Sequence, residues 1–155
     1  MSRLGETLQR AAEWLRPRRD DVLRDWVRAV ADVRGIPEAE AREGCARELD
    51  ALLDRLARGD VDGVVAEEAR RAGQETRRGA SLLGTALDLR VLDRCLAAVL
   101  VPACPDRESL AETLVALDEL GDRRLEALLA AQEDESSRRL VEAQEQAARA
   151  DERAR

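Results

Sequence analysis

Three charged residues in one apolar segment, Arg90, Asp93 and Arg94, are the side chains whose position most needs a chemical explanation. On a helical wheel of 100° per residue they fall inside an apolar sector that is formed by Leu83, Ala86, Leu87 and Ala97. Buried charges are costly unless they are paired, and Arg90 and Asp93 are close enough in sequence to form an internal or interfacial salt bridge. Alternatively, spare guanidinium donors of Arg90 or Arg94 hold an acidic ligand or a partner's carboxylate through two parallel hydrogen bonds.

The composition excludes much of the chemistry that other residue types perform. The 155 residues contain no His, Lys, Tyr or Phe, and the two Trp residues are the only aromatic ones. Without His there is no imidazole ligand for a metal or haem and no Ser-His or Cys-His dyad. Without Lys there is no P-loop lysine and no Schiff base. We therefore expect no catalytic residue, no cofactor and no metal site, and we do not expect an enzyme.

Charged side chains elsewhere in the chain are predicted to be solvated. The adjacent or near-adjacent carboxylates are expected on exposed faces or at helix starts, where they favour solubility and the helix dipole; they are Glu38 and Glu40, Glu67 and Glu68, and Asp134 and Glu135. A group of arginines interspersed with glutamates is expected to form an exposed face of mixed charge; its arginines are Arg70, Arg71, Arg77 and Arg78.

The net charge, the apolar runs and the cysteines indicate the kinds of partner and the cellular compartment to expect for this protein. The formal net charge is −7, which argues against nucleic acid, because nucleic-acid binding needs a basic face. The longest apolar run is about half of the roughly 18 residues that a membrane span needs, so no membrane insertion is expected. The odd set Cys45, Cys95 and Cys104 has no metal-binding spacing. We predict reduced structural thiols and a cytoplasmic protein.

Apolar residues recur at helical spacing along the whole chain and predict an all-α fold. Proline and glycine residues that end helices, and capping residues that begin them, predict six helices. Their predicted ranges are 4–15, 17–35, 37–59, 60–79, 82–101 and 106–155. Asp60, Ser81 and Asp106 are the predicted N-caps. The fifth helix is apolar almost all the way round, which predicts a place in the middle of the domain.

The last predicted helix is far longer than an ordinary globular helix and changes character at Asp134. Its distal part carries small apolar residues at intervals of three and four, and these predict a coiled-coil seam in a homodimer; they are Leu140, Ala143, Ala147, Ala150 and Ala154. The expected organisation is one bundle of about five core helices over residues 1–133, followed by a projecting linker helix over residues 134–155.

The segment from Glu75 to Leu96, ETRRGASLLGTALDLRVLDRCL, resembles the central helix of the RsbT co-antagonist RsbRD N-terminal domain family. Trp14-Leu15 and the segment from Val22 to Trp26 are similar to the opening helices of that family. The segment from Leu114 to Leu129, which is followed by a charged helix, is similar to the helix through which the chain leaves the domain in that family. The likeness covers roughly Leu4 to Arg139.

The resemblance implies a haem-free, globin-like sensory domain, a type that stands at the N-terminus of bacterial signalling proteins. It implies a regulatory input domain of a sensor histidine kinase or of an RsbR-like stressosome regulator. Such a domain dimerises and passes a conformational change through its C-terminal helix to a downstream effector in the same polypeptide, and any small-molecule ligand is unidentified. The alternative is a structural scaffold that only assembles a signalling complex.

Overall fold

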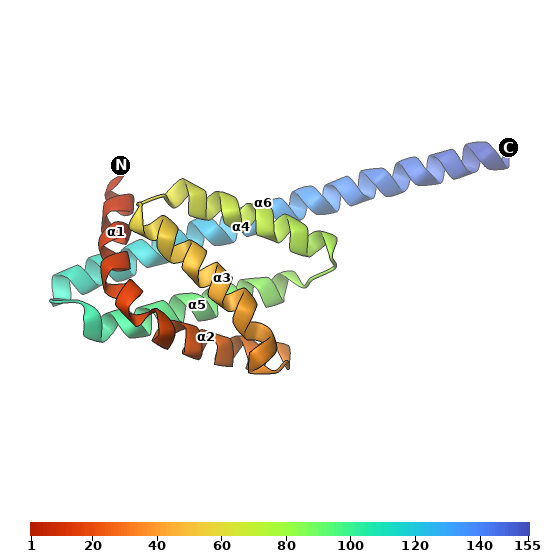
Figure 1. Cartoon of the computed structure of the whole chain (residues 1–155). Helices are drawn as coiled ribbons and strands as arrows, with labels where there is room; N and C mark the ends of the chain where they lie inside the picture. Colours follow the sequence, from red (N-terminus) through yellow and green to blue (C-terminus); the bar gives the residue numbers. More distant parts are fainter.

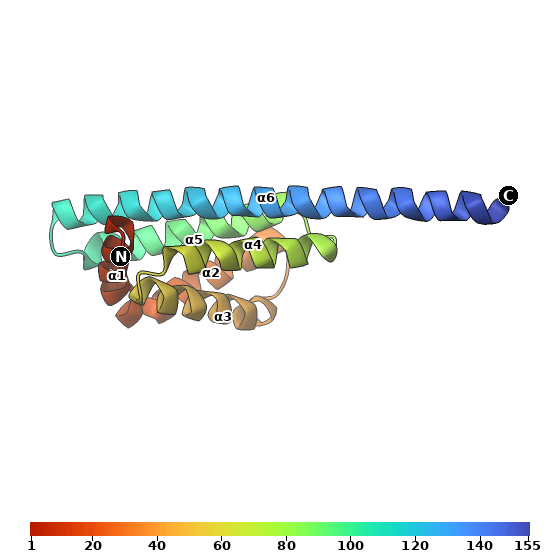
Figure 2. The ribbon, with the colours of Figure 1, turned by 90° about the horizontal axis from the view of Figure 1, so that it is seen from above.

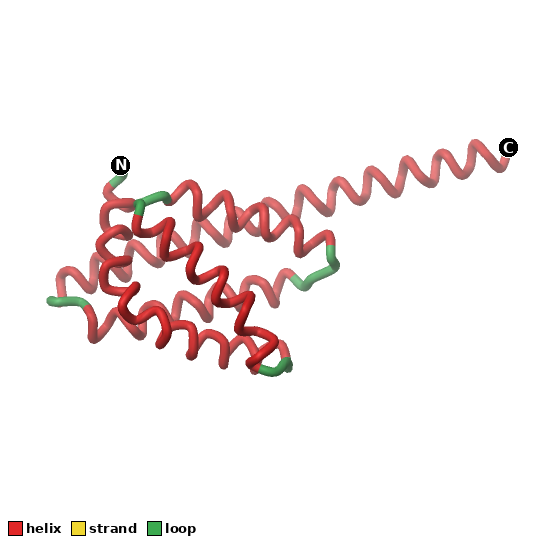
Figure 3. The backbone as a smooth tube through the Cα atoms, in the orientation of Figure 1, coloured by secondary structure: helices red, strands yellow, loops and turns green.

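The computed structural model describes residues 1–155 and consists of helices joined by short turns, without any strand. The elements in chain order are α1 (Arg3–Leu15), the 3₁₀-helix η1 (Arg16–Arg18), α2 (Arg19–Arg34), α3 (Glu38–Ala57), α4 (Val61–Arg77), α5 (Leu82–Ala103) and α6 (Arg107–Ala154). Figure 3 shows how little of the chain lies outside these elements. The predicted all-α fold class is confirmed, whereas the globin-like arrangement stays a prediction.

Local signals start and stop the helices where the sequence predicts them. Asp60, Ser81 and Asp106 each accept a hydrogen bond from the backbone N–H three residues further along, so all three predicted N-caps are confirmed. Gly35 and Gly59 follow α2 and α3 with φ of +64°, a left-handed conformation that favours glycine because a Cβ would be strained there.

Two prolines act differently from the prediction. Pro17 lies inside η1, and α2 begins after this turn, at Arg19. Pro102 does not end α5 at Val101, because α5 continues to Ala103 and Pro102 lies in its last turn. Pro102 has no N–H, so the last turn of α5 lacks one backbone hydrogen bond.

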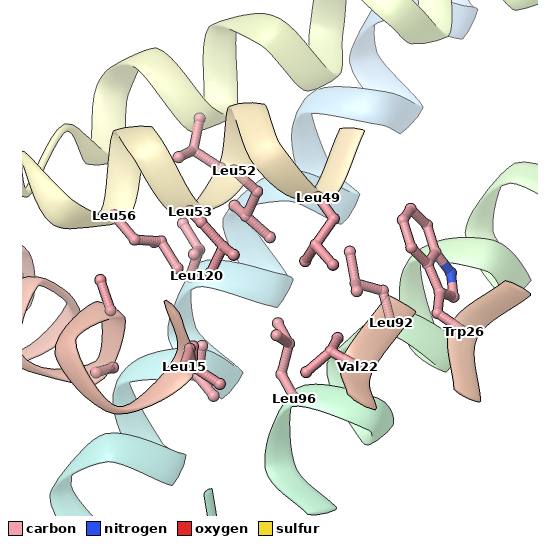
Figure 4. Packing of buried hydrophobic residues seen from close by; sticks show 14 of the residues in the cluster. Leu15, Val22, Trp26, Leu49, Leu52, Leu53, Leu56, Leu92, Leu96 and Leu120 are labelled. Atoms are coloured by element: carbon pink, nitrogen blue, oxygen red, sulfur yellow. The ribbon is translucent and has the colours of Figure 1, made fainter. Parts of the chain in front are cut away.

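The core is a single cluster of buried aliphatic side chains with one indole at its edge. It draws on every α-helix, and Figure 4 shows part of it, with Leu15, Val22, Trp26, Leu49, Leu52, Leu53, Leu56, Leu92, Leu96 and Leu120 labelled. The indole N–H of Trp26 donates to the backbone carbonyl of Asp88 at 3.3 Å, which ties α2 to α5. Because rings are almost absent, leucine, valine and alanine fill this interior.

Helix α5 lies at the side of the bundle, so the prediction that it occupies the middle is wrong. It buries only one stripe, which consists of Leu89, Leu92, Leu96 and Leu100. Leu83 and Val101 are 68% and 57% exposed on its other faces. The helix contacts α1, α2 and α6 mainly along that stripe, with Val91, Cys95 and Val99 partly buried beside it, and part of its apolar surface stays exposed. None of the helices has a stretch that is both long and apolar enough to cross a membrane.

Helix α6 is one unbroken helix of 48 residues, as the sequence predicts. Its first part packs along α1, α4 and α5, and its distal part extends beyond the bundle (Figures 1 and 2). Contacts with the bundle continue past the predicted boundary at Glu133, because the Arg139 guanidinium donates to the Thr76 carbonyl at 2.6 Å. We call residues 140–154 the rod.

Candidate functional site

Arg90, Asp93 and Arg94 line an open groove of about 780 Å³ between α5 and α6, together with Val115 and Asp118 among others. Arg90 and Arg94 are exposed, and no salt bridge joins Arg90 to Asp93. The predicted internal pair is therefore wrong for this chain. The wheel groups these residues correctly, but the sector that contains them faces solvent. A role for this groove in holding a ligand or a partner stays a prediction.

Asp93 is the one member of this group that points toward the bundle. Its Oδ2 atom lies 2.8 Å from the place where a Cβ would stand on Gly121, so α5 approaches α6 closely at a residue without a side chain. Burial raises the pKa of Asp93 to about 6, although the nearby guanidinium groups of Arg124 and Arg90 favour its charged form.

Glu68 and Arg124, two of the three buried charged residues, belong to a cluster that the sequence did not predict. Glu68 of α4 is 2% exposed and Arg124 of α6 is 5% exposed, and the guanidinium of Arg124 donates to Glu68 Oε2 at 3.1 Å. Arg71 donates to the same oxygen and also pairs with Glu48 of α3, at 2.6 Å. These four residues, Glu48, Glu68, Arg71 and Arg124, form the buried ion-pair cluster, which joins α3, α4 and α6.

Glu68 contradicts the prediction that the paired carboxylates are exposed, and Arg71, at the edge of the cluster, is not on a fully solvated face. The sequence did contain a signal for this outcome. Glu68 lies four residues from both Val64 and Ala72, which are buried, so it occupies the apolar side of α4. Arg124 lies four residues from the buried Leu120 and Leu128 on α6 in the same way. Opposite charges at buried positions of two helices predict a buried pair.

Glu135 also departs from the expected exposure of the carboxylates. It is buried where α6 leaves the bundle, and its carboxylate lies 3.6 Å from Arg77 and 3.4 Å from Arg138. Together with the bond from Arg139 to α4, these contacts hold α6 against the C-terminal end of α4. The ion pair between Arg77 and Glu135 and the bond from Arg139 to Thr76 therefore fix the base of the rod on α4.

A second pair of charges flanks the buried cluster. Arg34 of α2 donates to Asp88 of α5, and the Thr85 hydroxyl donates to Glu75 Oε2 at 2.7 Å. Burial raises the pKa of Asp88 and of Glu48, while the arginine partner of each acts in the opposite direction. Charged groups from α2, α3, α4, α5 and α6 thus meet in one region.

A cleft of about 470 Å³ opens between α3 and α4 over this region, and we call it the α3–α4 cleft. Its lining includes the whole buried ion-pair cluster and, around it, further charged side chains; they are Arg47, Arg55, Glu67, Arg70, Glu75 and Arg78. Guanidinium and carboxylate groups are strong donors and acceptors, so this arrangement suits the recognition of a small charged molecule.

The three thiols are in surroundings that favour their neutral form. Burial raises the pKa of Cys45 to about 11 and also raises the pKa of Cys95 and Cys104, so each thiol is a poor nucleophile. All three cysteines are free. No group of His, Cys, Asp and Glu has the arrangement of a metal site.

The chain matches no protein-family model, no curated protein and no solved structure. The likeness to the RsbRD family therefore stays a prediction from the residue pattern.

We expect Arg124→Met to lower the free energy of unfolding by about 1.5–3 kcal/mol, because the buried Glu68 carboxylate loses one of its two guanidinium partners and keeps only Arg71. The double variant Glu68→Met with Arg124→Met should recover much of that loss, because Arg71 keeps Glu48 as a partner. Urea unfolding measures both. The control Arg123→Met, which breaks only the exposed pair with Glu119, should cost less than about 1 kcal/mol. Equal losses for Arg124→Met and Arg123→Met would contradict the role of burial.

Asp93→Asn should stabilise the protein by about 1 kcal/mol more at pH 7.5 than at pH 5. The pKa of Asp93 is about 6 in the folded protein and about 3.9 when unfolded, so its contribution is present at low pH and is lost as the pH rises through 6. Arg90, Asp118, Glu68 and Arg124 surround it and stay unchanged. Urea unfolding at both pH values tests this, with Asp122→Asn as an exposed control on α6.

Proposed function

We propose that this chain is a regulatory input domain of a bacterial signal-transduction protein, which dimerises and passes a conformational change through its C-terminal helix. The observation that supports the proposal is the continuity of α6, which carries Arg124 in the buried ion-pair cluster and the rod outside the bundle in one helix of 48 residues. A change at the cluster and a movement of the rod are therefore mechanically linked.

The Glu68–Arg124 bond determines how α6 lies against α4. A helix transmits displacement along its axis because its backbone hydrogen bonds resist bending within a few turns. If a cue alters the pairing of Glu68, α6 shifts or rotates relative to α4, and the rod moves with it. A coupling free energy of about 1–3 kcal/mol is enough to bias two such packings.

The second copy of the chain would pair along the rod. Leu140, Ala143, Ala147, Ala150 and Ala154 are all exposed and follow one side of the helix at intervals of three and four. Alanine makes a close but weak seam, which suits an assembly whose two helices can change register. In the family that the chain resembles, the output is a kinase or a stressosome domain that follows the input domain.

A structural scaffold is the second candidate, and one observation favours it. Apolar side chains on α5 and on the neighbouring face of α6 are exposed, with Leu83 and Val115 each 68% accessible. Uncovered apolar surface of this kind is typical of assembly interfaces. A scaffold needs such a face but needs no coupling between the buried cluster and the rod.

Dimerisation through the rod is tested by Leu140→Glu. The carboxylate should weaken association at least tenfold in sedimentation experiments, because it enters the apolar seam, and it should leave the fold intact, because residue 140 is outside the core. The matched control is Val141→Glu, an exposed neighbour about 100° around the helix from the seam. A wild-type chain that is monomeric at high concentration would contradict this part of the proposal.

Coupling between cluster and rod is tested with a spin label at Gln144, an exposed position at the flank of the seam. In the dimer, Glu68→Gln should change the distance between the two labels by a few ångströms, because α6 loses its charged partner on α4. Glu119→Gln, which alters only an exposed pair on α6, is the control. A label distance that is the same in all three proteins would favour the scaffold.

A further inference from the structure

The α3–α4 cleft is electrically polarised between its floor and its rim. The floor contains Glu48, Glu68 and Glu75 with only two arginines, so it carries an excess negative charge. The rim contains Arg47 and Arg78, which are exposed and form no salt bridge within the chain. A molecule that enters the cleft therefore meets positive charge first and negative charge at the bottom.

Glu68 offers an unused hydrogen-bond acceptor at this floor. Arg71 and Arg124 both donate to its Oε2 atom, and its Oε1 atom has no partner although it is fully buried. A buried carboxylate oxygen without a donor is costly, because it has lost its water and gained no hydrogen bond. A positively charged donor in the cleft would keep both existing bonds, and it would reach Oε1 once the side chains that cover this atom move aside.

The other unpartnered atoms in this region have a simpler explanation. Asp88 Oδ1 and Arg124 Nε are also buried without partners, and both residues line a separate void of about 20 Å³. A void of this size suits a single water molecule between polar groups. Glu68 does not line that void but lines the α3–α4 cleft. The unpartnered Oε1 atom of Glu68 therefore points to a ligand that binds in the cleft.

We propose that the α3–α4 cleft binds a small zwitterion of the α-amino acid class. Its ammonium group would donate to Glu68 Oε1 at the negative floor, and its carboxylate would be held by Arg47 and Arg78 at the positive rim. An ammonium group supplies three donors to a carboxylate, and a guanidinium matches a carboxylate with two parallel bonds. The cleft is of the size that small-molecule sites in proteins have.

The charge pattern disfavours the two simpler ligand types. A dicarboxylate would satisfy the rim but would bring negative charge toward Glu68 and Glu48. A diamine would satisfy the floor but would be repelled by the rim arginines. Only a molecule with both charges meets both requirements. Binding of this kind needs no rod, but as the cue for the proposed input function it rests on that function.

The test is calorimetric titration of the full chain with three matched sets of compounds. L-Alanine and L-glutamate carry both groups, propionate and glutarate lack the ammonium, and ethylamine and putrescine lack the carboxylate. We expect at least one of the two amino acids to bind at least tenfold more tightly than the compounds that lack either group. Absence of binding by both amino acids would overturn the proposal, as would equal binding of the matching carboxylates.

Variants connect the binding to the named residues. Glu68→Gln should weaken binding of the preferred amino acid at least tenfold. The double variant Arg47→Gln with Arg78→Gln changes only exposed residues, so it remains informative if Glu68→Gln does not fold. It too should weaken binding at least tenfold, whereas Arg42→Gln, exposed on α3 outside the cleft, should not. Unchanged binding in the double variant would contradict the assigned site.

The same titration separates this proposal from the proposed function. Binding of an amino acid that leaves the label distance at Gln144 unchanged would uphold the site and count against transmission through the rod. A label distance that responds to Glu68→Gln, without binding of any amino acid, would uphold transmission and overturn the site.

Discussion

The buried bond between Glu68 and Arg124 is the constraint on which the arrangement of α4 and α6 depends. Two charges at this depth tolerate little displacement. If the helices slide apart, Arg124 loses its partner and Glu68 keeps only Arg71, and the free energy of an unpaired buried charge is high. Apolar packing alone allows small changes of register at similar free energy, but a buried ion pair does not. The extensive contact between α4 and α6 is therefore specific in its register as well as favourable.

The molecule has two distinct kinds of surface around this constraint. One side, over α3 and α4, is rich in charge and has a cleft that reaches the buried ion-pair cluster. The other side, over α5 and α6, leaves apolar residues uncovered, Leu83 and Val115 among them. Charged clefts suit small polar ligands, whereas uncovered apolar faces suit other polypeptides. In the proposed input domain the charged cleft would receive the cue, whereas the uncovered apolar face is the feature that favours a scaffold.

The sequence predicts the helices of this protein well because their signals are local. Asp60, Ser81 and Asp106 cap helices through bonds to residues three positions away, and nothing distant is needed to recognise them. The candidate site could not be predicted in the same way. The spacing of Glu68 from Val64 and Ala72 indicates the apolar side of α4, but it does not tell that Arg124 of α6 packs there. Because α5 is apolar on several sides, its pattern does not tell which side faces the core. The burial of Glu68 and the exposure of Arg90 both follow from tertiary packing.

The length of the rod makes it a lever, which converts a small rotation at its base into a larger displacement at its end. Its 15 residues from 140 to 154, at about 1.5 Å per residue, extend about 22 Å from the clamp at Arg139. A pivot of about 5° at that clamp would swing Ala154 sideways by about 2 Å, which is comparable with the helix displacements that switch protein interfaces. A rearrangement too small to disturb the leucine core would thus be amplified at the far end of the helix.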